Sequence, residues 1–243
     1  MLSKNEVKYT QSLCHKKHRD EERLFIAEGP KLAEEILKSN FEIKQVYATN
    51  KWLQTQPSLT VPVSEISEAE LTLISNLQTP NHVFIIAKQK LPGKEPVLAN
   101  NLTLVLDGIQ DPGNFGTIVR IADWFGIKQI VASGDSVEVY NPKVVQSTMG
   151  SICRVDVWYK DLVQWLEQPN IPVYGALLNG QNVHMLKNIK EGLLVIGNES
   201  KGIREPLKFK ITHPVTIPKT GEAESLNAAV AAGIIVGCMV NNV

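Results

Sequence analysis

Cysteine and long apolar runs are scarce in this sequence. The 243 residues include three cysteines, Cys14, Cys153 and Cys238. An odd, widely spaced set does not form a disulfide framework and is typical of the reducing cytosol. The longest run without charged or strongly polar side chains, Ala228–Val240, is too short to span a bilayer, and we expect a helix buried on all sides. Because the first 20 residues lack the apolar segment of a signal peptide, we expect a cytoplasmic protein without membrane association.

Net charge is also absent, since 25 basic side chains balance 25 acidic ones. The overall charge therefore does not identify a polyanionic partner. A local excess of basic side chains opens the chain, where a single acid, Glu6, accompanies Lys4, Lys8, Lys16, Lys17 and Arg19. Such a run forms either a nucleic-acid-binding face or an ordinary solvated helix.

Several familiar catalytic motifs are missing. There is no G-x-G-x-x-G after a first strand, no G-x-x-x-x-G-K-[ST] and no G-x-S-x-G, which argues against a Rossmann dinucleotide site, a P-loop and a hydrolase elbow. Cys14, His15 and His18 lie close together, but no second pair of ligands completes a zinc site. We expect no bound metal.

What the sequence does contain is an alternation of β- and α-type segments in two blocks. In the first ninety residues we expect helices at 3–18, from Pro30 and at 68–75, and strands at 24–27, 43–48, 61–66 and 83–87. Such a block can form a small α/β domain. Residues 88–101 contain two prolines, one glycine and no clear period, which indicates a linker. We set the domains at 1–90 and 102–243, joined by a linker at 91–101.

The second block has longer elements. We expect helices at 114–125, 142–151, 161–167 and 225–240, and strands at 102–106, 127–132, 155–159, 171–177, 193–197 and 214–217. Because the strands are almost continuously apolar, they favour a mostly parallel sheet covered on both faces.

The loop after the first of these strands leads into a helix that ends at Gly126. Asn114 is placed to cap this helix, and Arg120 follows nearly two turns later. Asn114 offers a donor and an acceptor, and Arg120 offers a bidentate fork for phosphate or carboxylate. The alternative is a simple helix cap followed by a surface arginine.

Two further polar loops follow later strands. Glu199 lies between Gly197 and Gly202, where its carboxylate could accept from a hydroxyl or an amine or belong to a plain turn. Ser225 is a plausible cap of the last helix, with Asn227 in its first turn, and here too capping alone is an alternative. Because all three polar loops end strands of one predicted sheet, a cofactor cleft explains them better than three separate turns.

In this order, the three blocks resemble the TrmH (SpoU) family of RNA ribose 2′-O-methyltransferases in the SPOUT superfamily. The family patterns N-x-G-x-x-x-R, G-x-E-x-x-G and I-P followed by S-L-N are matched by Asn114–Arg120, Gly197–Gly202, Ile217-Pro218 and Ser225–Asn227. Arg23, Phe25 and Glu28-Gly29 are similar to the small ribosomal-protein-like substrate-binding domain often fused in front. The resemblance covers nearly the whole chain, more loosely in the first ninety residues.

This resemblance implies a SPOUT-type α/β fold with a C-terminal trefoil knot that binds S-adenosylmethionine near Gly197, Ile217 and Leu226. It implies a homodimer that packs through the last helix and an RNA substrate, with rRNA favoured over tRNA. It also assigns the catalytic side chains, namely Asn114, Arg120, Glu199, Ser225 and Asn227. The candidate RNA-binding side chains are Lys16, Lys17, Arg19 and Arg23.

Two other functions stay open at this point. One is a non-catalytic RNA-binding or ribosome-assembly factor that keeps the fold, against which the intact polar blocks argue. The other is a SPOUT enzyme that methylates a base nitrogen.

Gln146 departs from the family pattern, since many relatives carry a basic residue there. The identity of the RNA substrate therefore does not carry over from the resemblance.

Overall fold

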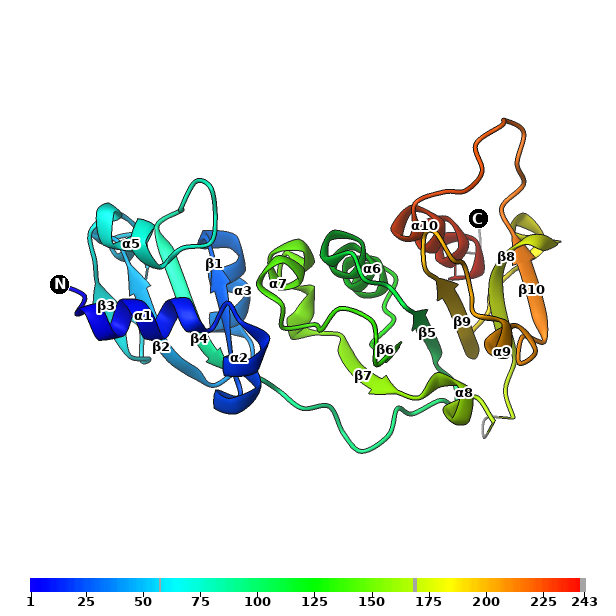
Figure 1. Ribbon diagram of the computed structural model, residues 1–243, viewed down its shortest axis with the longest axis horizontal. Helices are drawn as coiled ribbons and strands as arrows, with labels where there is room; N and C mark the ends of the chain where they lie inside the picture. Colours follow the sequence, from blue (N-terminus) through cyan, green and yellow to red (C-terminus); the bar gives the residue numbers. More distant parts are fainter. Residues whose placement is uncertain (57, 168–169, 241–243) are drawn as a thin grey trace. The chain divides into compact units, whose positions relative to one another are not determined.

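The computed structural model describes residues 1–56, 58–167 and 170–240. The chain divides into two compact units, and residues 138–153 leave the second half of the sequence to pack in the first unit (Figure 1). The first unit holds residues 1–91 and 138–153, and the second holds residues 92–137 and 154 onward. The chain passes from the first unit to the second between Leu91 and Pro92, within the predicted linker at 91–101, and residues 138–153 of the predicted second domain belong to the first unit. The end of the predicted domain, 241–243, lies outside the described residues.

The first unit contains a four-stranded sheet in the order β1-β4-β2-β3. β4 runs antiparallel to β1 and β2, and β3 runs parallel to β2. The strands are β1 (Leu24–Glu28), β2 (Ile43–Ala48), β3 (Val63–Glu65) and β4 (Val83–Lys88). The helices among them are α1 (Lys4–Ser12), α2 (Lys16–Glu22), α3 (Pro30–Lys38), α4 (Asn50–Leu53) and α5 (Glu68–Ile74). All four strands expected from the sequence are present.

The helix predicted at 3–18 is wrong in one respect, because it is two helices. The Arg19 guanidinium donates to the carbonyls of Leu13 and Cys14 at 3.0 and 2.6 Å. An uninterrupted helix would give those carbonyls to backbone N–H groups one turn later. The chain therefore turns at Leu13, whose side chain is fully buried in the core of this unit.

The segment 138–153 contributes α7 (Pro142–Thr148) and the 3₁₀ turn η1 (Ser151–Cys153) to the first unit. The ring of Tyr140 lies 4.9 Å from that of Phe25, and Glu138 pairs with the buried Arg19. Gly150 adopts a φ of +97°, and a Cβ there would lie 2.5 Å from Cγ of Glu35. These contacts explain why the segment belongs to this unit.

The second unit contains a six-stranded sheet in the order β10-β8-β9-β5-β6-β7, and every described pair in it is parallel. The strands are β5 (Leu102–Asp107), β6 (Gln129–Ser133), β7 (Asp156–Lys160), β8 (Val173–Asn182), β9 (Gly192–Gly197) and β10 (His213–Thr216). The other elements are α6 (Pro112–Trp124), α8 (Leu162–Trp165), η2 (Val183–Met185), α9 (Glu205–Lys208) and α10 (Ala228–Val240). The predicted α/β class and mostly parallel sheet are confirmed.

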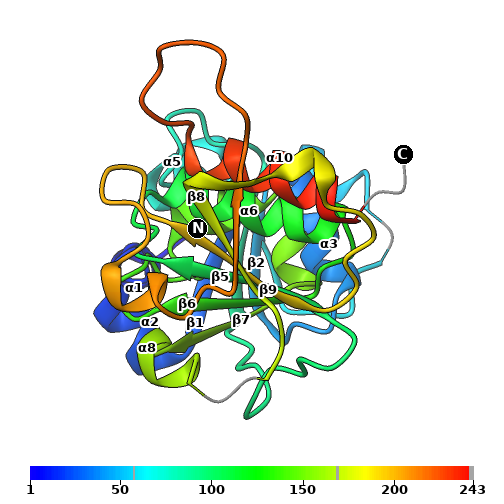
Figure 2. The ribbon, with the colours of Figure 1, turned by 90° about the vertical axis from the view of Figure 1, so that its right-hand side faces the viewer.

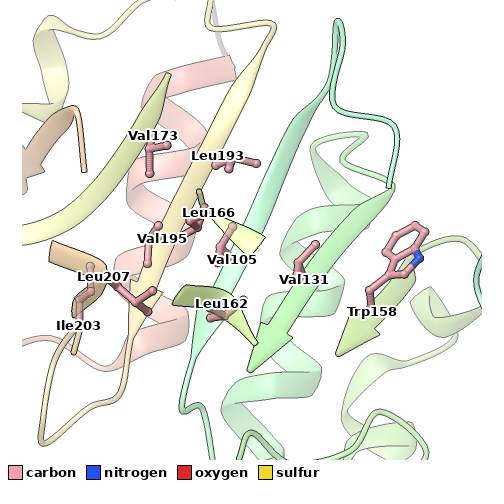
Figure 3. Close-up of a cluster of buried hydrophobic side chains, with 10 residues drawn as sticks. All are labelled: Val105, Val131, Trp158, Leu162, Leu166, Val173, Leu193, Val195, Ile203 and Leu207. Carbon is pink, nitrogen blue, oxygen red and sulfur yellow. The ribbon is translucent and has the colours of Figure 1, made fainter. Parts of the chain in front are cut away.

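Helices lie on both faces of this sheet. On one face, Leu162 of α8 and Leu207 of α9 pack in a cluster with strand residues that include Val105, Val131 and Val195 (Figure 3). Residues on alternate positions of a strand point to the opposite face, where α6 packs on β6 and α10 packs on β9 and on α6. The sheet is thus sandwiched between two helical layers, as its continuous apolar strands predict.

The small residues of α10 bring it close to α6. A Cβ on Gly233 would meet Ile121 at 3.5 Å, and one on Gly237 would meet Phe125 at 3.5 Å. The expectation that α10 is buried on all sides is wrong, because Val230 is 51% exposed and Ile234 is 36% exposed. In the described part of the chain, no helix has both the length and the apolarity to cross a membrane.

Candidate functional site

The helix α6 places the first predicted side chains. Asp111, not Asn114, caps this helix, because its carboxylate accepts the Asn114 N–H at 2.7 Å. Pro112 occupies the first turn, where a missing N–H costs nothing. The predicted cap at Asn114 is therefore wrong, and the reason is that an earlier acidic residue competes for the same N–H groups. The prediction that Gly126 ends the helix is confirmed, since it adopts a φ of +74°.

Because the cap is supplied by Asp111, the Asn114 side chain is free to bridge two other loops. Its Nδ2 donates to Glu199 Oε1 at 2.6 Å, and its Oδ1 accepts from Asn227 Nδ2 at 2.8 Å. One side chain from each predicted block thus joins a single hydrogen-bonded chain, Glu199–Asn114–Asn227. Asn114 lies 85 positions before Glu199 and 113 positions before Asn227 in the sequence.

Asn227 also fixes the start of α10. Its Oδ1 accepts from the N–H groups of Ala229 and Val230 at 3.0 and 3.2 Å. With the oxygen used there, the amide nitrogen must point toward Asn114. The predicted cap at Ser225 is wrong, because the helix begins at Ala228 and Ser225 is exposed ahead of it.

The loop that carries Glu199 is tightly closed. Asn198 and Gly202 pair with each other through two backbone hydrogen bonds, at 3.1 and 2.8 Å. A Cβ on Gly197 would lie 2.3 Å from the carbonyl carbon of Gly202, so only glycine fits there. The Asn198 side chain donates to the Gly108 carbonyl at 2.8 Å and fastens the loop to the chain just after β5.

Arg120 lies on α6, further along the helix than Asn114. Its side chain is exposed, and within the part of the chain that the structure describes no hydrogen bond or ion pair engages it. A guanidinium stays protonated in proteins and carries five N–H donors. Arg120 is therefore a free cation that can receive an anionic group.

A cavity of about 1080 Å³ is lined by the loops after β9 and β10 and by the end of β8. Of the predicted residues, the lining includes Gly197, Glu199, Ile217, Ser225 and Leu226. In both Figure 1 and Figure 2 the loop between β10 and α10, coloured orange to red, projects from the unit. Among described residues, 218–226 make no backbone–backbone hydrogen bond, so their N–H and C=O groups remain open to a ligand.

The four predicted RNA-binding side chains differ in their exposure to solvent. Lys16 and Lys17 are exposed and pair with Asp20 and Glu21 one turn later, at 2.6 and 4.0 Å, and Arg23 is also exposed. Arg19 differs, because its side chain is 1% exposed and its guanidinium binds Glu138 and two carbonyls. In this arrangement, Arg19 supports the unit internally and does not face solvent.

Asp107 and Arg204 form an ion pair that no motif in the sequence indicates. Asp107 ends β5 with a side chain of 0% exposure. Its carboxylate accepts from the Arg204 backbone N–H and Nε at 2.8 and 2.6 Å and forms an ion pair with Nη2 at 2.5 Å. Asp135 lies 3.7 Å from the same guanidinium, and the Ser133 hydroxyl lowers the pKa of that carboxyl. An aspartate at a strand end was visible in the sequence, but nothing in the spacing links it to an arginine 97 residues away.

No group of three or more potential ligands that could hold a metal is found across residues 1–56, 58–167 and 170–240. The three motif loops supply amides, the Glu199 carboxylate, the Arg120 guanidinium and the unpaired backbone of loop 218–226, and the cavity lining adds Glu224, Lys201 and Lys219. Such groups bind and orient ligands with a polar edge and an anionic group.

Comparisons with known proteins identify relatives of this chain. The chain matches the model of the SpoU rRNA Methylase family over residues 101–237 and that of the MRM3-like substrate binding domain over residues 4–85. It is 30% identical to the 23S rRNA (guanosine(2553)-2′-O)-methyltransferase RlmP of Bacillus subtilis, over 95% of this chain and 94% of that protein.

Solved structures are similar over both units. A TrmH-family protein from Porphyromonas gingivalis is 38% identical, with a TM-score of 0.88 and coverage of 99% of this chain and 98% of that one. The AdoMet-bound rRNA methyltransferase of Sinorhizobium meliloti is 29% identical, with a TM-score of 0.85 and coverage of 98% and 95%.

Proposed function

Because the chain belongs to the SpoU rRNA methylase family, we propose that it transfers a methyl group from S-adenosylmethionine to a ribose 2′-hydroxyl of structured RNA, with rRNA favoured over tRNA. The observation that carries this proposal is the chain Glu199–Asn114–Asn227 beside the cavity, which unites all three motif loops. The names of relatives support rRNA, since the Bacillus subtilis protein is a 23S rRNA 2′-O-methyltransferase.

The residues present fit S-adenosylmethionine. Loop 218–226 offers unpaired N–H and C=O groups for the polar edge of an adenine. Two side chains of the cavity wall add apolar surface: Ile217, which is half-buried, and Leu226, which is 47% exposed. Together with Gly197 these residues would hold the cofactor, which supplies an electrophilic sulfonium methyl group when bound. A related rRNA methyltransferase was solved with AdoMet bound.

Arg120 would meet the ribose and its phosphate. Methyl transfer would need the 2′-oxygen aligned behind the methyl group, so that the oxygen–methyl bond forms as the sulfur–methyl bond breaks and a neutral thioether departs. The hydroxyl proton would pass to water, and the negative charge that develops on the oxygen would need stabilisation. A guanidinium does not act as a base at neutral pH, because it stays protonated. We assign Arg120 to hold the RNA phosphate and stabilise the developing alkoxide, while Asn114, Glu199, Ser225 and Asn227 orient the substrate and the loops.

We assign residues 1–90 to RNA binding, residues 91–101 to the linker and residues 102–243 to catalysis. The exposed Lys16, Lys17 and Arg23 support RNA binding by the first domain, as does its match to a substrate binding domain model. Since the chain is neutral overall, local cations such as these must supply the phosphate contacts. The three free cysteines suit a cytoplasmic site of action.

We also propose a homodimer that packs through α10. The apolar Val230 and Ile234 are exposed on one face of this helix, and a stripe of exposed apolar residues favours burial against a partner. Replacing Ile234 with Lys is expected to shift the sedimentation coefficient from dimer to monomer, with Lys128→Ala as the control at an exposed position. A wild-type protein that sediments as a monomer at micromolar concentration would contradict this proposal.

The C-terminal trefoil knot belongs to the same proposal. The chain after β10, at the edge of the sheet, returns so that α10 packs on β9 and α6, and such a return supports a threaded segment. Knots are rare among folds. An experimentally traced chain whose C-terminal segment passes through no loop would contradict the knot without affecting the proposed reaction.

Two measurements test the function. Calorimetric titration with S-adenosylmethionine should show binding, and maps of ribose methylation in rRNA from cells with and without this protein should differ at a discrete site. RNA binding without cofactor binding would instead indicate a non-catalytic assembly factor.

A further inference from the structure

We propose that Asp107 is a positioning residue for the methyl transfer, because through Arg204 it holds the Glu199 loop where it reaches Asn114. This inference rests on the proposed function. It adds a residue outside all three sequence motifs and names the contact through which it acts.

The carboxylate of Asp107 is committed to one partner residue. Its side chain has 0% exposure, and its described hydrogen bonds both come from Arg204, one from Nε and one from the backbone N–H, with Nη2 of the same guanidinium paired to it at 2.5 Å. A buried carboxylate is strongly destabilising unless it is paired and hydrogen-bonded. Because this charge is satisfied only when Arg204 lies at the end of β5, the pair fixes the chain that follows the Glu199 loop.

A second contact fixes the start of the same loop. Asn198 Nδ2 donates to the carbonyl of Gly108, the residue after Asp107, at 2.8 Å. Asn198 Oδ1 accepts from the N–H groups of Ser200 and Lys201 at 3.0 and 3.1 Å. Gly108 has a φ of +69°, a conformation that glycine adopts at little cost. Both ends of the loop are thus fastened to two adjacent residues at the end of β5.

Glu199 lies between these two fastenings. No helix holds it, and its loop contains only an isolated bridge between Asn198 and Gly202. The position of its carboxylate, 2.6 Å from Asn114 Nδ2, therefore depends on the fastenings to β5. Misplacing catalytic groups by about 1 Å can lower turnover about a hundredfold.

Asp135 provides a matched control. It faces the same guanidinium at 3.7 Å, but its side chain is 52% exposed, and no hydrogen bond in the described structure joins it to the Arg204 backbone or to Asn198. Exposed pairs of this kind contribute little. Asp107 and Asp135 thus share a partner and differ in whether they hold the loop.

The test measures turnover at saturating cofactor and RNA in the full chain. Asp107→Asn is expected to lower kcat about 10- to 100-fold, whereas Asp135→Asn stays within about twofold. In the Glu199→Gln background, Asp107→Asn is expected to lower kcat no further, because both changes act through the same carboxylate. An undiminished effect of Asp107→Asn in that background, or an equal effect of Asp135→Asn, would overturn the proposal.

Amide hydrogen exchange tests the same contacts without activity. Exchange at residues 198–204 should accelerate in Asp107→Asn and not in Asp135→Asn. If Asp107→Asn fails to fold, Arg204→Lys keeps the charge and removes the fork, and it should show the same pattern with a smaller loss. Unchanged exchange in these variants would overturn the positioning role, whereas a wild-type protein without methyl transfer would overturn only the proposed function.

Discussion

Polar side chains have different partners in the two units. In the first unit, the buried side chains of Arg19 and Glu28 bind loops of the same unit. Arg19 donates to two backbone carbonyls just after α1, and Glu28 accepts from the Ser75 hydroxyl and the Asn76 N–H. In the second unit, Glu199, Asn114 and Asn227 bind one another beside a cavity. A change in the first set should alter stability, and a change in the second set should alter turnover.

Arg120→Ala should give the largest effect. Losing the charge that stabilises the alkoxide is expected to lower methylation about a thousandfold. Cofactor affinity should change less than about twofold, because Arg120 does not line the cavity. Single-turnover methylation and calorimetry measure the two quantities, with Lys128→Ala as the control at an exposed cation. Near-normal methylation by the variant would show that Arg120 is a surface arginine only.

Arg19→Ala, in the first unit, should lower the stability of the protein. Removing one partner of a buried pair is expected to cost about 3 kcal/mol in the free energy of unfolding. Lys17→Ala removes an exposed pair two residues away and should change stability by less than about 0.5 kcal/mol. Urea unfolding measures both. Similar losses in the two variants would contradict the internal role of Arg19.

Asn114→Asp should reduce turnover about a hundredfold while leaving stability nearly unchanged. It replaces the donor to Glu199 with a second carboxylate and keeps the acceptor for Asn227. Adding Glu199→Gln restores a donor and should recover part of the rate. The double-mutant cycle measures this coupling, and strictly additive losses would mean that the hydrogen bond does not matter.

Glu28 should give the smallest effect, seen as pH dependence. Burial raises the pKa of its carboxyl above the ordinary 4.5. A pKa raised in the folded state means a contribution to stability that is full below pH 4.5 and is lost as the pH rises through the raised value. The glutamine in Glu28→Gln cannot ionise. The melting temperature of this variant, relative to that of the wild type, should therefore rise as the pH increases above 4.5. A constant difference across that range would contradict the shift.

The sequence predicted the elements better than their connections. All six strands of the parallel sheet overlap the predicted ranges, and the central strands β5 and β9 match best because burial on both faces leaves a strong pattern. Near one edge of the sheet, β8 was predicted less well, since it continues to Asn182 through exposed, mostly polar residues. The predicted start of a helix differs from the observed one where two polar residues could each cap it. Asp111 caps α6, whereas the prediction placed the cap at Asn114. The short α9 was missed, because four residues carry no helical period.

Long-range pairs were beyond prediction from spacing. Asp107 and Arg204 lie 97 residues apart, and only the register of β5 beside β9 brings them together. The burial of Arg19 reversed the expectation from its basic neighbourhood, because a charge pattern shows surface preference but not the partner, Glu138, 119 residues away. The three motif loops were found, but their hydrogen-bonded chain required the fold.

The most direct test of the account is the identity of the methylated nucleoside. Ribosomal RNA isolated from cells lacking the protein would be incubated with purified protein and isotopically labelled S-adenosylmethionine, digested to nucleosides and analysed by mass spectrometry. We expect a label on a 2′-O-methyl nucleoside and no such label with Arg120→Ala. A labelled base, or no labelled nucleoside, would contradict it.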